Sequence, residues 1–144
     1  LHNHRWRLAS KVMLGALRSD LYRQAEAYEA DAETLALRLY RKRRGAHGAE
    51  GERFGERPVK RRATIIRYAG EAYCMDTDIL HRIVHAGGSA TLTLMVQSAP
   101  LFTSNHMLSQ PDVHEPELRP DRLQSVDQLT ALLNEIIALL DAAR

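Results

Sequence analysis

The chain has 144 residues, of which 44% are hydrophobic, and its 20 basic and 18 acidic residues leave a net charge of +2. The length predicts one domain, and this composition excludes a disordered chain and the strongly basic surface of a nucleic-acid-binding protein. No apolar run is long enough for a membrane-spanning helix, so no membrane partner is expected. The single cysteine, Cys74, excludes an internal disulfide framework and favours a cytoplasmic location.

The first expected element is a strand from His2 to Leu14 that ends at Gly15. Apolar and polar residues alternate along it, and alternate residues of a strand share a face. One face is expected to carry His2, His4, Trp6, Leu8, Ser10, Val12 and Leu14. Two imidazoles projecting side by side from an apolar strand face form half of a metal site.

The alternation continues beyond Gly15, so residues 12–23 predict a hairpin around this glycine. Residues 24–33 are rich in Ala and Glu and could form a helical turn or a loop. In residues 34–40 every second position is leucine, which predicts a strand even though Ala, Leu and Arg favour helices.

Residues 41–62 are expected to form a flexible loop, because they contain four glycines, a proline and few apolar residues. Basic runs stand at residues 41–44 and 60–62. A solvated insertion is the simpler interpretation, and a basic rim that steers an anionic substrate is the alternative.

Short strands with turns between them are expected from residue 63 to residue 97. The strands span residues 63–69, 71–75, 79–85 and 89–97, with turns at Gly70 and Asp76-Thr77-Asp78 and a hairpin at Gly87-Gly88. Because no long helix separates these strands, the pattern predicts an antiparallel sandwich or barrel.

Residues 100–124 contain four prolines and are expected to be irregular, whereas residues 125–143 predict a helix. Ser125 and Gln128 form a capping box. The helix carries one apolar stripe: Leu129, Leu132, Leu133, Ile136, Ile137 and Leu140. We expect this stripe to pack on the domain's own sheet, and a homodimer contact is the alternative.

Two segments match a known pattern in their spacing. The first reads His2-x-His4, three residues, Leu8, six residues, Gly15. The second reads Gly70, five residues, Asp76-Thr77-Asp78, two residues, His81, three residues, His85. They resemble the two motifs of the cupin superfamily: His-x-His, three or four residues, Glu, six residues, Gly; and Gly, five residues, Pro-x-Gly, two residues, His, three residues, Asn. The resemblance covers roughly residues 1–97.

The resemblance implies a mainly β, antiparallel cupin-like (jelly-roll) barrel, with residues 1–99 as its core inside a single domain of residues 1–144. It also implies that His2, His4 and His81 are metal ligands. Leu8 stands where a glutamate ligand is usual. A ligand set of three histidines without this glutamate resembles the three-histidine branch of the superfamily, which includes cysteine dioxygenase. The implied metal is Fe(II), although imidazoles also bind Zn, Ni and Cu, and Mn is a further alternative.

The resemblance further implies a dioxygenase that binds O2 and a small substrate at the metal. Three neutral ligands leave the charge of the ion uncompensated, which favours an anionic chelating substrate. A non-catalytic cupin that binds a metal or a small ligand is the alternative, and a cupin isomerase is a third class.

Five other side chains have possible roles near this site. Tyr73 and His85 are candidate catalytic residues that line the pocket, while His106 is not expected to be a ligand. Trp6 is expected in the core, with a pocket wall as the alternative, and Cys74 is expected to be buried. Because the first histidine stands almost at residue 1, further strands are expected upstream of Leu1.

Overall fold

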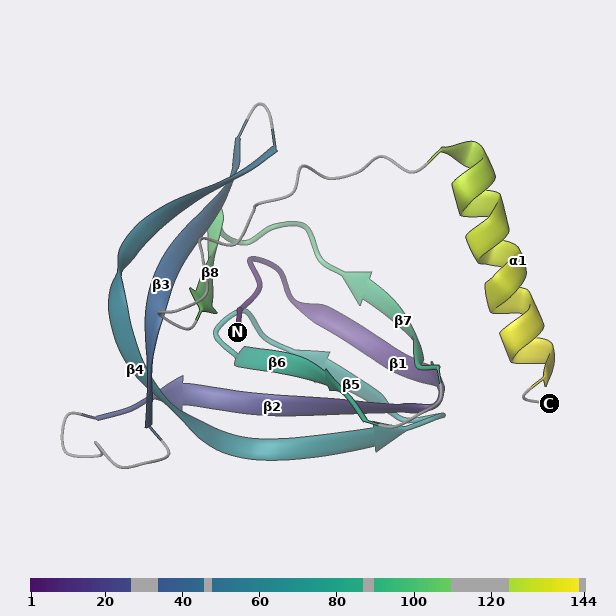
Figure 1. Ribbon diagram of the computed structural model, residues 1–144, viewed down its shortest axis with the longest axis horizontal. Coiled ribbons are helices and arrows are strands. Elements are labelled where there is room, and N and C mark those ends of the chain that lie inside the picture. Colours follow the sequence, from purple (N-terminus) through teal and green to yellow (C-terminus); the bar gives the residue numbers. More distant parts are fainter. Residues whose placement is uncertain (27–33, 46–47, 87–89, 110–124, 143–144) are drawn as a thin grey trace.

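Two antiparallel sheets and one helix make up the computed structural model of the protein, which describes residues 1–26, 34–45, 48–86, 90–109 and 125–142 (Figure 1). The elements are β1 (Leu8–Leu14), β2 (Ala16–Gln24), β3 (Thr34–Gly45), β4 (Gly48–Tyr68), β5 (Ala72–Met75), β6 (Leu80–His85), β7 (Leu92–Gln97), β8 (Ser104–Ser109) and α1 (Val126–Ala142). The smaller sheet has the strand order β5-β1-β7 and the larger sheet the order β6-β2-β4-β3-β8. The predicted mainly β, antiparallel class with a C-terminal helix is therefore confirmed.

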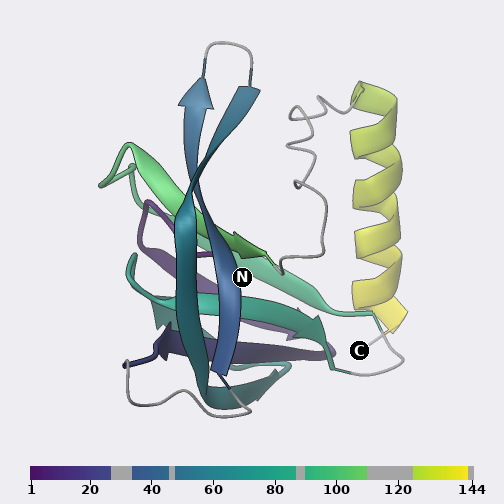
Figure 2. The same ribbon diagram turned by 60° about the vertical axis from the view of Figure 1, so that its left-hand side comes forward.

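Neither sheet closes on itself among the described strands, because each strand order has two ends. The closed barrel expected from the sequence is therefore not formed by this part of the chain. Figures 1 and 2 show that the larger sheet is strongly curled, because the long strand β4 bends from the direction of β3 into the direction of β2. The curl brings the two edge strands, β6 and β8, to opposite sides of residues 1–4, which we call the N-terminal segment. Both strands form bridges with His2 of this segment.

Gly15 takes the chain from one sheet into the other and does not close a hairpin, so the predicted hairpin is wrong. β1 pairs with β5 and β7, whereas β2 pairs with β4 and β6. The φ angle of Gly15 is 72°, and a Cβ atom here would overlap the carbonyl oxygen of Ala90. Only glycine meets both demands without strain. Alternation identified both strands but not their partners.

The hairpin expected at Gly87-Gly88 is wrong for the same reason. β6 belongs to the larger sheet and β7 to the smaller one, and residues 87–89 themselves lie outside the described residues. The alternation predicted along the first strand is confirmed within β1, where Leu8, Ser10 and Val12 are buried and the residues between them are exposed.

The β3–β4 hairpin occupies most of the segment expected to be a loop, so that prediction is wrong for residues 41–45 and 48–62. Its register places basic residues opposite acidic ones: Arg38 opposite Glu56, Arg41 opposite Glu52, and Arg43 opposite Glu50. Cross-strand pairs of opposite charge favour the part of the hairpin beyond residue 40, where the leucine alternation of β3 has ended. This complementarity, and not hydrophobic periodicity, was the signal in the sequence.

β8 lies inside the segment that was expected to be irregular and pairs with β3, which corrects that prediction for residues 104–109. Residues 110–124 lie outside the described residues. Leu108 of β8 joins a buried cluster with Tyr22, Leu37, Leu39 and Val59, and Leu1 and Leu80 pack against this cluster. Because burying a large apolar side chain contributes about 1.5–3 kcal/mol, the cluster anchors the first residue of the chain between β6 and β8.

α1 begins with the predicted capping box. Ser125 N donates to Gln128 Oε1 at 2.9 Å, and Gln128 N donates to Ser125 Oγ at 3.2 Å. The predicted packing of its apolar stripe is wrong, since no residue of α1 is buried and Leu133 is 57% exposed. Figures 1 and 2 show α1 beside the sheets, and the homodimer contact stays a prediction. No helix in the described part of the chain has the length and apolar character needed to cross a bilayer.

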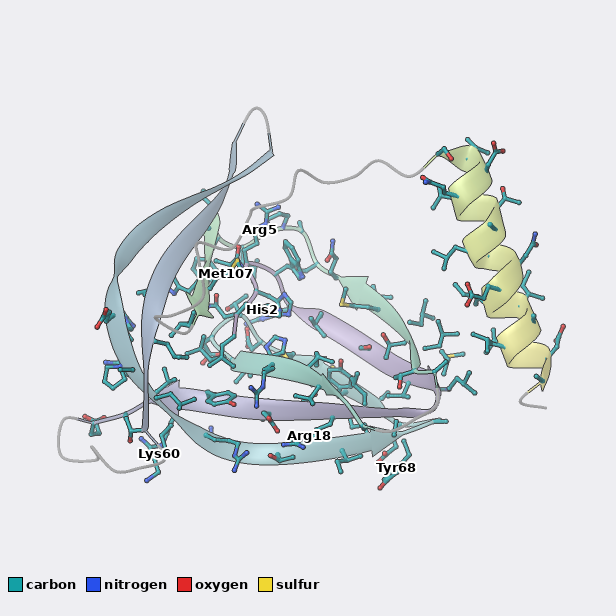
Figure 3. All side chains as sticks on the ribbon, viewed as in Figure 1. His2, Arg5, Arg18, Lys60, Tyr68 and Met107 are labelled. Carbon is teal, nitrogen blue, oxygen red and sulfur yellow. The ribbon has the colours of Figure 1, made fainter. Side chains whose placement is uncertain are left out.

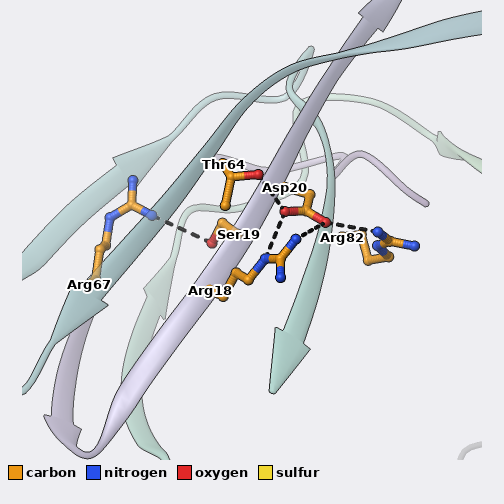
Figure 4. A network of polar contacts seen from close by, with 6 residues as sticks. All are labelled: Arg18, Ser19, Asp20, Thr64, Arg67 and Arg82. Atoms are coloured by element: carbon orange, nitrogen blue, oxygen red, sulfur yellow. Dashed lines mark hydrogen bonds and ion pairs between the residues drawn. The ribbon is translucent and has the colours of Figure 1, made fainter. Parts of the chain in front are cut away.

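A buried carboxylate ties three strands of the larger sheet together (Figure 4). Asp20 of β2 is fully buried and lies in register with Thr64 of β4 and Arg82 of β6. Its oxygens accept hydrogen bonds from Thr64 Oγ1 at 2.8 Å, Arg82 Nη2 at 2.8 Å and Arg18 Nε at 3.0 Å. Burial raises the pKa of Asp20, but these bonds outweigh burial and lower the pKa from 3.8 to about 2. Because Arg82 follows His81, the network fixes the strand that carries the third histidine.

We expect Asp20→Asn to lower the free energy of unfolding by about 2–3 kcal/mol at neutral pH, because the two arginines lose their counter-charge. Since folding lowers the pKa of Asp20, its stabilisation is present above 3.8 and is lost as the pH falls through about 2. The wild type should therefore lose on the order of 2 kcal/mol over this interval that the variant does not lose. Urea unfolding at neutral pH measures the first effect, and a series that continues to about pH 1 measures the second, of which only about half is lost by pH 3.

Asp76→Asn is the matched control. Its ion pair with Arg7 joins side chains that are 52% and 67% exposed, so the substitution should change stability far less than Asp20→Asn does. Equal losses in the two variants would contradict a special role for the buried network.

Candidate metal centre

The N-terminal segment lies between the two edge strands of the larger sheet. His2 N donates to His81 O at 3.1 Å, and His81 N donates to His2 O at 3.0 Å. On the other side His2 forms a bridge with Met107 of β8, and Asn3 N donates to His106 O at 3.1 Å. The backbone therefore sets His2 directly opposite His81.

The strand predicted from His2 to Leu14 is interrupted before β1. A bend at residues 5–6 separates the N-terminal segment from β1, which begins at Leu8. The bend carries the chain from the edges of the larger sheet to the centre of the smaller sheet. His2 and His4 nevertheless lie on the same side of the chain, as predicted, because their ring centroids are 5.0 Å apart.

The structure brings together His2, His4 and His81, which we call the histidine cluster. The ring centroids of His2 and His81 lie 4.5 Å apart, and those of His4 and His81 lie 4.9 Å apart. One ring nitrogen from each residue lies within 4.8 Å of the others. Figure 3 shows His2 in the middle of the fold, close to Met107.

Burial favours the neutral form of His4 and His81. His81 is 3% exposed, and burial lowers its pKa below 6.5, outweighing the hydrogen bond to Ile79, which raises it. Burial also lowers the pKa of His4, and the neighbouring His81 adds to this effect. A neutral imidazole keeps the lone pair that a metal ion needs.

A backbone carbonyl orients the His81 ring. Nδ1 of His81 lies 3.2 Å from the carbonyl oxygen of Ile79. A proton on Nδ1 donated to this carbonyl leaves Nε2 with its lone pair, so Nε2 is the nitrogen that would bind a metal ion. Histidines that bind metals make this type of hydrogen bond through the second ring nitrogen.

The donor set fits a divalent transition metal. An ion bound about 2.1 Å from each nitrogen holds neighbouring ligand atoms about 3–3.5 Å apart, so ring nitrogens that lie within 4.8 Å of one another would move closer together on binding. Imidazole donors suit Fe, Ni, Cu and Zn, so the residues do not select one of them. Leu8, at the position where the cupin motif has glutamate, is buried and apolar, and it supplies no fourth ligand.

The two candidate catalytic residues differ in how the structure places them. Tyr73 lies on β5, where the guanidinium of Arg67 stacks over its ring at 4.2 Å. The backbone of His85 ends β6, and its side chain lies outside the described residues. A catalytic role for either residue stays a prediction.

Trp6 and His106 both lie near His4. The centroid of the Trp6 ring is 5.7 Å from that of His4, and its indole Nε1 is buried without a hydrogen-bond partner among the described residues. His106 lies on β8 and lines a cavity together with His4. Cys74 is exposed, which corrects its expected burial. It faces outward because its neighbours Tyr73 and Met75 occupy the inward positions of β5.

The cavity beside His4 has a volume of about 320 Å³. Its lining includes Thr77 and Asp78, from the turn before β6, as well as Phe102 and His106. The sequence pattern indicates only a turn at Asp78. Its position three residues before His81 was a signal that it could lie close to the cluster.

Comparisons with protein-family models, curated proteins and solved structures find no match. The function therefore has to be argued from the geometry of the histidine cluster and its surroundings.

We expect the purified protein to bind one divalent transition-metal ion, and His81→Ala to weaken binding by more than about 100-fold, because it removes a ligand and not only an outer hydrogen bond. His2→Ala and His4→Ala should have the same effect. Elemental analysis after dialysis measures the retained metal, and circular dichroism checks that each variant folds.

His106→Ala is the matched control, because His106 lies near His4 but is not part of the histidine cluster. It should retain the metal. Unchanged metal content in a folded His81→Ala protein would overturn the assignment.

Proposed function

We propose that the chain is a cupin-type Fe(II)-dependent oxygenase that binds a small metal-chelating substrate and O2 at the histidine cluster. The observation that carries this proposal is the meeting of His2, His4 and His81, with a ring nitrogen of each within 4.8 Å of the others. The cluster joins two sequence segments whose spacing resembles the two cupin motifs. Such a combination is a stronger argument than a cluster of histidines alone.

The arrangement of the strands supports the same proposal. Two antiparallel sheets are the coarse architecture of a jelly roll. The first motif passes through the N-terminal segment and β1, and the second passes through β5 and β6. Direct hydrogen bonds between His2 and His81 join the two motifs. The finer cupin topology is part of the proposal.

The side chains present can hold a metal and leave room for other ligands. The three imidazoles provide three nitrogen donors. The apolar Leu8 stands where the motif has its fourth ligand, which leaves that coordination position to a substrate. Fe(II), when bound, would supply the electrons for O2 chemistry. The chain orients His81 through the Ile79 carbonyl, keeps His4 and His81 neutral, and presents His4 to a cavity. The protein thus contributes orientation and polarity.

The proposal predicts substrate-dependent O2 consumption by the iron-loaded protein. After anaerobic loading with Fe(II), nitric oxide should give the EPR signal of a non-heme iron nitrosyl. A screen of thiols, 2-hydroxy acids, 2-oxo acids and enediols should then find at least one compound that raises O2 uptake about tenfold or more over background, which corresponds to about 1.4 kcal/mol of barrier.

His81→Ala, treated in the same way, is the control and should show neither signal. Full iron loading without nitric oxide binding or substrate-dependent O2 uptake would contradict the oxygenase and favour a non-catalytic metal-binding protein.

A further inference from the structure

The cavity beside His4 contains one carboxylate, from Asp78, and no lysine or arginine among its lining residues. The other polar groups in its lining are neutral side chains such as Asn3 and Thr77, together with the imidazoles of His4 and His106. A ligand that extends from the histidine cluster into this cavity would therefore meet a negative charge. A positively charged donor group fits this charge best.

The two aspartates of the same turn differ in what they contact. The Asp76 carboxylate accepts hydrogen bonds from Arg7 Nε at 3.2 Å and from Thr77 N at 2.8 Å. It therefore belongs to the structure of the turn. Asp78 makes no hydrogen bond or ion pair with any described residue, and it lines the cavity. Its charge is thus available to a ligand.

We propose that the cavity beside His4 binds the distal end of the substrate, and that this end carries an ammonium group recognised by Asp78. The inference rests on the proposed function, because the other end of the same molecule chelates the metal held by the histidine cluster. A volume of about 320 Å³ is at the lower end of the range for ligand sites. The substrate is therefore a small amine-bearing chelator. An anionic group binds the metal, and a cationic group lies at Asp78.

Three hydroxamates with the same chelating head and different tails test this inference. The probes are 3-aminopropanehydroxamate, butanehydroxamate and succinic monohydroxamate, whose tails end in an ammonium, a methyl and a carboxylate. Co(II)-loaded protein is titrated with each probe, and the visible absorption of Co(II) reports binding. The ammonium probe should bind about two- to fivefold more tightly than the methyl probe, as expected for a solvent-exposed ion pair, and the carboxylate probe should bind most weakly.

Asp78→Asn should abolish the order of affinities, whereas Asp76→Asn, from the same turn, should retain it. Added salt should reduce the preference of the wild type, because an exposed charge pair is screened. The Co(II) spectrum of both variants without probe should match that of the wild type, which shows that the variants fold and bind metal.

The outcomes separate the two proposals. Failure of the wild type to give a Co(II) spectrum would overturn the metal site and this inference with it. Binding of Co(II) and of the hydroxamates with equal affinities for all three tails would overturn only the role of Asp78. The same conclusion would follow if the preference for the ammonium probe survived in Asp78→Asn.

Discussion

The pairing of His2 with His81 is the contact on which the candidate site depends. The two residues exchange backbone hydrogen bonds of 3.1 and 3.0 Å, so they stand directly opposite each other. Opposed residues of such a pair have Cα atoms about 5.5 Å apart, which puts their side chains within reach of each other. His4, two residues further along, reaches the same place. Backbone pairing, and not the ordering of a loop, therefore assembles the three imidazoles.

This pairing requires that β6 be held firmly, although β6 is an edge strand of the larger sheet. Among the described strands its one neighbour is β2, and the Asp20 network reinforces that contact through Arg82. A fully buried carboxylate would be costly if it were left unpaired. Here the side chains of Arg18 and Arg82 are 35% and 50% exposed, so the charges that satisfy Asp20 remain partly hydrated. The network thus fixes the register of β6 without the full cost of burying its cations.

The candidate site has a buried end, at His81, and an end that opens to a polar cavity, at His4. His81 is almost completely buried, and its pKa is lowered by that burial. His4 lines a cavity whose other walls carry polar side chains and the carboxylate of Asp78. A metal ion would lie at the buried end, and a charged group of its ligand would lie at the end with the polar cavity.

The sequence by itself determined the local elements and the identity of the three histidines. Alternation predicted the buried face of β1, a capping box predicted the start of α1, and the motif spacing singled out His2, His4 and His81. The first two features depend on residues that are close together in the chain, and the third depends on a resemblance between sequence motifs. Only the tertiary structure decided which strands pair, because alternation is the same whichever neighbour a strand has. It therefore corrected the hairpins at Gly15 and at Gly87-Gly88.

The tertiary structure also showed that residues 41–45 and 48–62, expected to form a loop, belong to the β3–β4 hairpin, because basic residues stand opposite acidic ones there where the leucine alternation has ended. It showed that the apolar stripe of α1 is not buried, because amphipathicity indicates that a helix face can be covered but does not identify what covers it. Finally, it distinguished Asp76 from Asp78. The two are equivalent turn residues in the sequence, but only one meets an arginine, because Arg7 lies near them in space and far from them along the chain.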